Sequence, residues 1–195
     1  MKEIILYMAR VLRRFDLTAK SFFALVEPGS CYAGNLLELA LASDRVYMLN
    51  HPEETVEVAT GTLNAGPLLM STGLTRLQTR FLATPEQVDT VLTAGRFATE
   101  AAEAAGLVTF APDDLDWDDE VRVAIEERTS LSPDALTGME ANLRFAGPET
   151  CDTKIFGRLT AWQNWIFQRP NAVGPTGALS NYGQPTQAQF DYKRT

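Results

Sequence analysis

The chain has 195 residues, of which 45% are hydrophobic, and it carries a formal net charge of −8. These values fit one globular domain or one and a half, and the apolar runs are far too short to cross a bilayer. Lys and Arg form no basic stripe that could follow a phosphate backbone, so neither nucleic acid nor a membrane is an expected partner. The N-terminal sequence lacks the order of a signal peptide, and the expected location is the cytoplasm.

Cysteine and histidine, the usual ligands of zinc, are scarce in this chain. The two cysteines, Cys31 and Cys151, lie far apart in the sequence and are expected to be free thiols. The single histidine, His51, cannot supply a zinc cluster, and a Ser-His-Asp triad would have to use this one residue. The sequence therefore predicts no metal site.

The first part of the chain predicts the order helix, strand, helix, strand. Apolar residues recur at helical spacing over 3–14, and an apolar run over 21–27 is typical of a buried strand that ends in a turn. Helix formers fill the segment from Gly34 to Ser43, and strand-like residues follow at 45–49. A weaker strand at 56–60 leads into a loop over 61–67.

The rest of the chain is predicted to be mainly helical. Helices are expected at 68–81, 85–92, 100–105, 117–128 and from Ser132-Pro133 to about Phe145, with Thr99 as an N-cap, Gly106 after a helix end, a short strand at 107–110, and Gly147-Pro148 as a stop. An aromatic segment follows at 152–168, and the polar residues from Asn171 on predict an extended or disordered tail. The expected regions are thus 1–110, 111–170 and 171–195.

One segment has the layout that thioester chemistry requires. Gly34-Asn35 begins a helix, where backbone N–H groups can stabilise negative charge on a carbonyl oxygen. Glu38 lies one turn into that helix, among leucines, where a carboxylate could act as an acid or base. A glutamate in such a helix can also simply face solvent or a partner, and local sequence alone leaves both interpretations open.

Three segments in order resemble the crotonase superfamily. In that superfamily a glycine-rich loop leads to Glu and to a small, apolar helix ending in Cys-Asp or Ser-Asp, as Gly34 to Asp44 does here. Downstream, Gly66-Pro67 with Leu74 to Leu77, and then Thr99 to Val108, resemble further landmarks of the superfamily. The resemblance covers about residues 20–110. It implies an α/β fold, namely the second half of a crotonase-like ββα spiral followed by a mainly helical C-terminal region.

The resemblance also implies roles for single residues, with two departures. Gly34, Asn35 and Gly66 correspond to the oxyanion and substrate-binding positions, although Gly34 alone remains of the usual glycine triplet. Glu38 corresponds to the first catalytic glutamate, whereas Thr62 occupies the position of the second. Asn64 could hydrogen-bond a hydroxyl group or a water, and Thr62 and Asn64 can equally be ordinary loop residues.

A narrower resemblance runs nearly from end to end. Residues 27–45, 132–150 and 155–174, with the Trp-rich block, are similar to the C-terminal part of the benzoyl-CoA-dihydrodiol lyase family. This implies hydrolytic ring opening of 2,3-epoxy- or 2,3-dihydrodiol-benzoyl-CoA to 3,4-dehydroadipyl-CoA semialdehyde and formate. It implies no cofactor, because coenzyme A is part of the substrate.

Members of that family are more than twice as long, so the chain is expected to be a C-terminal fragment, the product of a misplaced start, or one piece of a split protein. Its expected partners are the aromatic-derived acyl-CoA substrate and the missing N-terminal segment. Two alternatives stay open. One is another crotonase reaction, such as hydration or isomerisation, and the other is an inactive fragment or oligomerisation module that uses the aromatic helix with Trp162 and Trp165.

Overall fold

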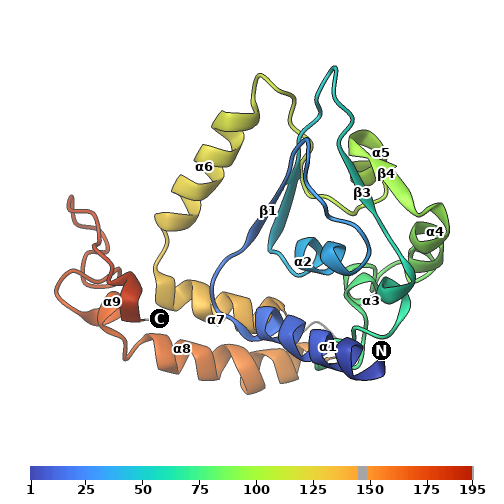
Figure 1. Ribbon diagram of the computed structural model, residues 1–195. Helices are drawn as coiled ribbons and strands as arrows, with labels where there is room; N and C mark the ends of the chain where they lie inside the picture. The colour runs from blue at the N-terminus through green and yellow to red at the C-terminus, as the bar shows by residue number, and fades with distance from the viewer. Residues whose placement is uncertain (145–148, 195) are drawn as a thin grey trace. The chain divides into compact units, whose positions relative to one another are not determined.

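The structure is a computed structural model that describes residues 1–144 and 149–194, and it is drawn in Figure 1. The chain divides into two compact units. The first consists of Met1–Thr18 and Phe22–Arg122, and the second of Ala19–Ser21 and Val123–Thr195. The first unit therefore extends beyond residue 110. The helix end predicted near Phe145 and the stop predicted at Gly147-Pro148 lie outside the described residues.

The first unit combines short strands with short helices. In chain order these are α1 (Lys2–Leu17), β1 (Phe23–Val26), a 3-10 helix (Gly34–Leu36), α2 (Leu37–Leu41), β2 (Arg45–Met48), β3 (Glu57–Ala59), a second 3-10 helix (Thr62–Ala65), α3 (Arg76–Arg80), α4 (Gln87–Ala94), β4 (Arg96–Ala98) and α5 (Thr99–Ala104). The helix α6 (Trp117–Thr129) begins in this unit.

Two small sheets hold this unit together. β1 and β2 are parallel, with Phe23 opposite Arg45, and β3 and β4 are antiparallel, with Val58 opposite Phe97. In a parallel pair the connection must cross back over the sheet, and α2 forms that connection, packed against both strands (Figure 1). The core between these elements is made of buried aliphatic residues, including Val26, Leu37, Met48, Val58, Leu77 and Val91.

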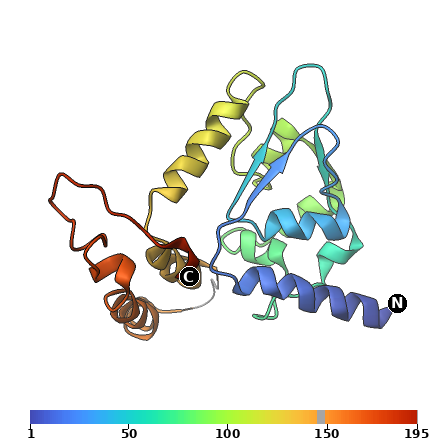
Figure 2. The ribbon, with the colours of Figure 1, turned by 60° about the vertical axis from the view of Figure 1, so that its left-hand side comes forward.

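The amphipathic helix α1 covers a second, smaller cluster. Its buried face carries Ala9, Leu12 and Asp16, and the first two pack with Leu68 and with Leu39 of α2. Figure 2, which views the protein from another direction, also shows α1 running beside α2. The spacing of three and four residues is that of one helix face, so Asp16 continues the apolar face of α1 into the protein.

Four predictions for this unit were wrong in part. The helix expected at 68–81 is helical only from Arg76, because Thr75 and Gln78 form a capping box in which the Thr75 hydroxyl accepts from the Gln78 N–H at 3.0 Å. Thr99 is the first residue of α5 rather than its cap, and its hydroxyl donates to the carbonyl of Leu49 at 2.9 Å.

The strand expected at 107–110 is reduced to one bridge between Phe110 and Tyr47. The N–H groups of Thr109 and Phe110 both donate to the carbonyl of Val46, at 2.8 and 3.2 Å, so they share one acceptor instead of continuing a ladder. The loop predicted at 61–67 also contains the 3-10 helix Thr62–Ala65.

The second unit is helical. After the end of α6 it contains α7 (Pro133–Leu143), a π-helix (Thr153–Leu159), α8 (Thr160–Ile166), α9 (Pro170–Val173) and a 3-10 helix (Tyr192–Arg194). α7 and α8 pack closely, because a Cβ on Gly138 would lie 3.0 Å from Ile166 Cδ1. An open, apolar groove of about 440 Å³ lies between these helices, lined in part by Leu143, Trp162 and Phe167.

The segment after Asn171, expected to be an extended tail, folds back on itself. The N–H groups of Ala178 and Leu179 donate to the carbonyls of Asn171 and Ala172, and the Asn171 side chain exchanges two hydrogen bonds with the backbone of Asp191. Backbone hydrogen bonds and the Asn171 amide thus hold this polar segment in place. Over residues 1–144 and 149–194, no helix has both the length and the apolar character that a membrane crossing requires.

Candidate active site

The turn before α2 depends on a glycine. Gly34 has φ of 52°, in the left-handed region that costs other residues roughly 1–2 kcal/mol. The preceding residue, Ala33, is extended and bridges Ala59 next to the turn. A Cβ on Gly61 would lie only 3.3 Å from Gly34 Cα, so the two glycine backbones approach closely. The turn is therefore fixed against β3 and the loop that follows it.

Glu38 lies one turn further on and is buried. Its residue exposure is only 1%, and Leu37 and Ala40 of the same short helix are also buried. Both carboxylate oxygens accept a hydrogen bond: Oε1 from the Asn64 amide at 2.6 Å and Oε2 from the Arg76 guanidinium at 2.9 Å. The glutamate therefore does not face solvent, and its two hydrogen-bond partners are those that a buried carboxylate needs.

Asn64 connects the glutamate to the turn. Its amide nitrogen donates both to Glu38 and to the carbonyl of Gly34, the latter at 2.9 Å. Its amide oxygen accepts the N–H of Gly61 at 2.8 Å. Two donor hydrogens and one acceptor are thus used inside the protein, and Asn64 holds Gly34, Gly61 and Glu38 in one arrangement.

Arg76, the first residue of α3, completes the cluster. Its guanidinium donates to Glu38, to the carbonyl of Leu68 at 3.3 Å and to Asp16 Oδ2 at 2.8 Å. The side chains of Asp16, Glu38 and Arg76 are each 1% exposed. We call Asp16, Arg76, Glu38 and Asn64 the buried carboxylate cluster.

Opposing effects act on the pKa of Glu38 in this cluster. Burial raises the pKa of Glu38 above its ordinary value of 4.5, and the negative charge of Asp16 acts in the same direction. The hydrogen bonds from Asn64 and Arg76 and the charge of Arg76 lower that pKa but do not cancel the effect of burial. A carboxyl group with a raised pKa can donate and accept a proton closer to neutral pH.

The structure brings together three of the six residues singled out from the sequence, namely Gly34, Glu38 and Asn64. Thr62 lies in the same 3-10 helix as Asn64, but its side chain is exposed and outside the cluster. Asn35 and Gly66 are half-buried, and Gly66 is extended with φ of 172°. The roles of all six toward a substrate stay predictions.

Sequence reasoning missed the role of Asp16 and Arg76. Arg76 was noted only within the segment Leu74 to Leu77, and Asp16 was not singled out. A signal for Asp16 is present, because it falls at the i+4 position from Leu12 on the apolar face of α1. A carboxylate on an apolar helix face needs a buried partner, but the sequence does not say which arginine.

A pocket lies just before the Gly34 turn. It has a volume of about 250 Å³ and is lined in part by Ser30, Tyr32 and Ala33, with Arg96 as its basic residue. Ala33 is the N-cap of the 3-10 helix that begins at Gly34. Gly34 and Glu38 are not among the residues that line this pocket.

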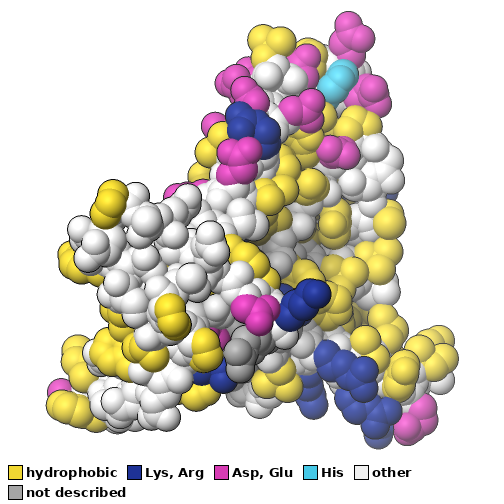
Figure 3. Space-filling view, turned by 90° about the vertical axis from the view of Figure 1, so that its left-hand side faces the viewer, with side chains coloured by type: hydrophobic (Ala, Val, Ile, Leu, Met, Phe, Trp, Pro, Cys, Tyr) yellow, Lys and Arg dark blue, Asp and Glu magenta, His cyan; other side chains and the backbone are white. Residues whose placement is uncertain are grey.

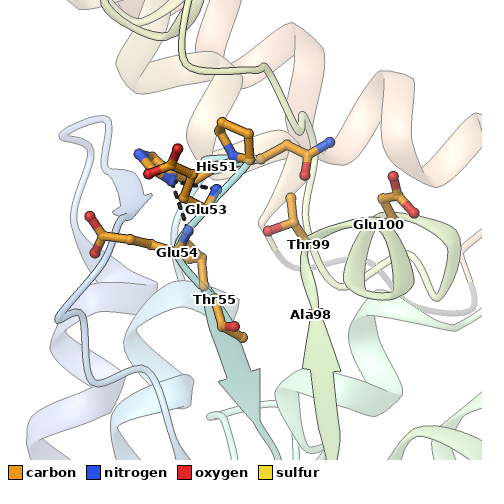
Figure 4. A pocket seen from close by; sticks show the side chains of 10 residues that line it. His51, Glu53, Glu54, Thr55, Ala98, Thr99 and Glu100 are labelled. Atoms are coloured by element: carbon orange, nitrogen blue, oxygen red, sulfur yellow. Dashed lines mark hydrogen bonds between the residues drawn. The ribbon is translucent and has the colours of Figure 1, made fainter.

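His51 lies in another pocket, shown in Figure 4. Its Nδ1 accepts the N–H groups of Glu53 and Glu54 at 3.2 and 2.9 Å, so the ring closes the turn that leads to β3. Figure 3 shows the single histidine among acidic side chains. Within residues 1–144 and 149–194, no three His, Cys, Asp or Glu side chains are grouped to hold a metal ion.

Comparison with known proteins gives one similar sequence and many similar folds. No protein-family model matches the chain. The benzoyl-CoA-dihydrodiol lyase of Aromatoleum evansii is 53% identical over 195 residues, which cover 99% of this chain and 35% of that protein. The chain thus spans 35% of the length of this relative.

Among solved structures, the enoyl-CoA hydratase of Geobacillus kaustophilus matches with a TM-score of 0.72 and 16% identity, over 97% of this chain and 68% of that one. The enoyl-CoA hydratase of Bacillus anthracis gives a TM-score of 0.70 and 13% identity, over 96% and 69%. The predicted fold, the second half of a crotonase-like spiral followed by a mainly helical region, is confirmed. The chain has the fold of the enoyl-CoA hydratases, and over nearly its whole length its sequence is similar to that of a benzoyl-CoA-dihydrodiol lyase.

Proposed function

We propose that the chain is part of an enzyme that opens the ring of 2,3-epoxy- or 2,3-dihydrodiol-benzoyl-CoA with water. The products would be 3,4-dehydroadipyl-CoA semialdehyde and formate. The observation that carries this proposal is the 53% identity, along 99% of the chain, to a benzoyl-CoA-dihydrodiol lyase. The likeness to enoyl-CoA hydratases supports the fold but not this choice of reaction, since their identity is only 13–16% in the two structures compared.

Glu38 is the proposed acid–base residue. It is held by two hydrogen bonds next to the Gly34 turn, and burial raises its pKa. A carboxylate has about four acceptor positions, and Asn64 and Arg76 occupy two of them. The other two positions are the ones proposed to exchange a proton with the substrate. The cluster therefore offers an oriented carboxyl group that is shielded from water.

The N–H of Asn35 is the proposed oxyanion donor. It belongs to the first turn of the 3-10 helix, where N–H groups precede the intrahelical ladder. Asn64 fixes the carbonyl of Gly34, the residue before it. A preorganised donor of this kind is worth about 10²–10³-fold in rate. A second donor and the binding surface for coenzyme A would come from the further length that the relative has.

Thr62 separates this proposal from simple hydration. It stands where the resemblance expects a second catalytic glutamate, and its side chain is exposed outside the cluster. Hydration commonly needs both carboxylates, so a single buried Glu38 fits ring opening better. We further propose a cytoplasmic location and, from the apolar groove between α7 and α8, self-association through the second unit.

The test is formate release by the full-length protein that contains this sequence, supplied with the ring-epoxide thioester. Glu38→Gln should lower turnover by about 10²–10⁴-fold, the range of general acid–base catalysis. The matched control is Glu103→Gln, an exposed position on α5 that should leave turnover unchanged. Absence of formate from the unaltered protein would overturn the proposed function, and unchanged turnover in Glu38→Gln would exclude Glu38.

A further inference from the structure

Two buried charged residues extend the hydrogen-bonded cluster beyond Glu38. Asp16 comes from the end of α1 and Arg76 from the start of α3, and both side chains are 1% exposed. One guanidinium nitrogen of Arg76 binds Glu38 at 2.9 Å, and the other binds Asp16 at 2.8 Å. The guanidinium therefore bridges the two carboxylates, with one terminal nitrogen bound to each.

This arrangement places two acidic side chains around one basic side chain. A guanidinium stays protonated in proteins, so two ionised carboxylates around one arginine carry a formal charge of −1 in a buried place. The Nε–H of Arg76 has no hydrogen-bond partner in the part of the chain that the structure describes. The two terminal nitrogens of the guanidinium are directed at the two carboxylates.

We propose that Asp16 and Arg76 are positioning residues for Glu38: Arg76 fixes the direction of its carboxyl group, and Asp16 fixes Arg76 by binding its other terminal nitrogen. This inference rests on the proposed function, because it assigns a task to the acid–base role of Glu38. Neither residue is proposed to touch the substrate. The two act through Glu38 and, by way of Asn64, are connected to the turn at Gly34.

The surroundings leave few other charges that could do the same. β1 and β2 face α2 with apolar side chains such as Val26 and Met48. The 3-10 helix Thr62–Ala65 contributes the neutral Asn64. Among the described residues, Arg76 and Asp16 are the charged groups that act on Glu38, with opposite effects on its pKa: Arg76 lowers it and Asp16 raises it.

The geometry predicts opposite responses to two substitutions. Asp16→Asn keeps the shape but removes a negative charge, so Glu38 should ionise at lower pH. Arg76→Lys keeps the positive charge, but a point-like ammonium cannot reproduce the fork that binds both carboxylates. Glu38 should then ionise at higher pH and turnover should fall, by up to about 10²-fold if the carboxyl group is displaced by 1 Å.

The experiment measures the pH profile of kcat/KM for formate release by the full-length protein. The limb that Glu38→Gln abolishes is assigned to Glu38. It should move to lower pH in Asp16→Asn and to higher pH in Arg76→Lys, with little change in KM. Asp119→Asn, at an exposed carboxylate of α6 whose side chain is 79% exposed, is the control and should leave the limb in place. Limbs unmoved in both folded variants would overturn the inference.

A second measurement separates this inference from the proposed function and covers a variant that folds poorly. The pH dependence of unfolding, compared between the unaltered protein and Glu38→Gln, reports the ionisation of Glu38 without any substrate. Asp16→Asn should shift that dependence to lower pH even if no formate is ever released. If formate is released but the dependence is the same with and without Asp16, the proposed function survives and the positioning role fails. If the pH dependence of unfolding is the same with and without Asp16 and the full-length protein releases no formate, the positioning role and the proposed function are both refuted.

Discussion

Arg76→Met should destabilise the first unit far more than the loss of an ordinary surface arginine. The substitution removes the donors to Glu38 Oε2, to Asp16 Oδ2 and to the carbonyl of Leu68, at a place where the side chains are 1% exposed. Breaking a buried ion pair from one side leaves charge without compensation and costs about 3–5 kcal/mol. Methionine fills much of the volume, so the loss of packing adds little.

The matched control is Arg96→Met in the same unit. Arg96 pairs with Glu57 at 3.2 Å, but the two side chains are 78% and 42% exposed. Water screens such a pair, whose expected contribution is about 0–1 kcal/mol. The same change of residue type therefore tests burial and not the chemistry of arginine alone.

The measurement is urea unfolding followed by circular dichroism, with the slopes compared to check that the same transition is observed. The penalty of Arg76→Met should shrink as the pH falls, because protonated carboxyl groups no longer need the guanidinium charge. A loss no larger than that of Arg96→Met would refute the reasoning. So would a penalty that does not change with pH.

Three further predictions follow from the same cluster and from the comparisons. Because burial raises the pKa of Glu38 above 4.5, its stabilising contribution is complete below that value and is lost as pH rises through the folded-state pKa. As pH rises through this range, the free energy of unfolding of the unaltered protein should therefore fall relative to that of Glu38→Gln. The same pH dependence in both proteins would contradict the assignment. Gly34→Ala should cost roughly 1–2 kcal/mol, since φ is 52° and a Cβ there meets open space; a neutral change in melting would mean that the turn is not constrained. The 195-residue chain alone should release no formate from the ring-epoxide thioester, because it spans 35% of its relative, and activity should appear when the remaining segment is added; formate from the chain alone would disprove this.

Much of the local structure could be predicted from sequence because it depends on neighbours along the chain. The helix over α1 follows from apolar residues at one face, and the strand at β1 ends where Pro28-Gly29 cannot continue it. The helix start at Thr75 was missed, although its capping box with Gln78 is also local. The strand at 107–110 failed for another reason, because pairing depends on a distant partner, here Val46 and Tyr47.

The sequence by itself determined the position of the candidate site: a glycine turn, a helix start and a glutamate one turn later, together with the order of landmarks that indicates the fold. It could not determine what surrounds Glu38. Asp16, Asn64 and Arg76 come from three other elements of the first unit and meet only when α1, α3 and the 3-10 helix pack around α2. The pKa of a carboxyl group depends on its burial and on charges within a few ångströms, and both are properties of the packed structure rather than of the chain order.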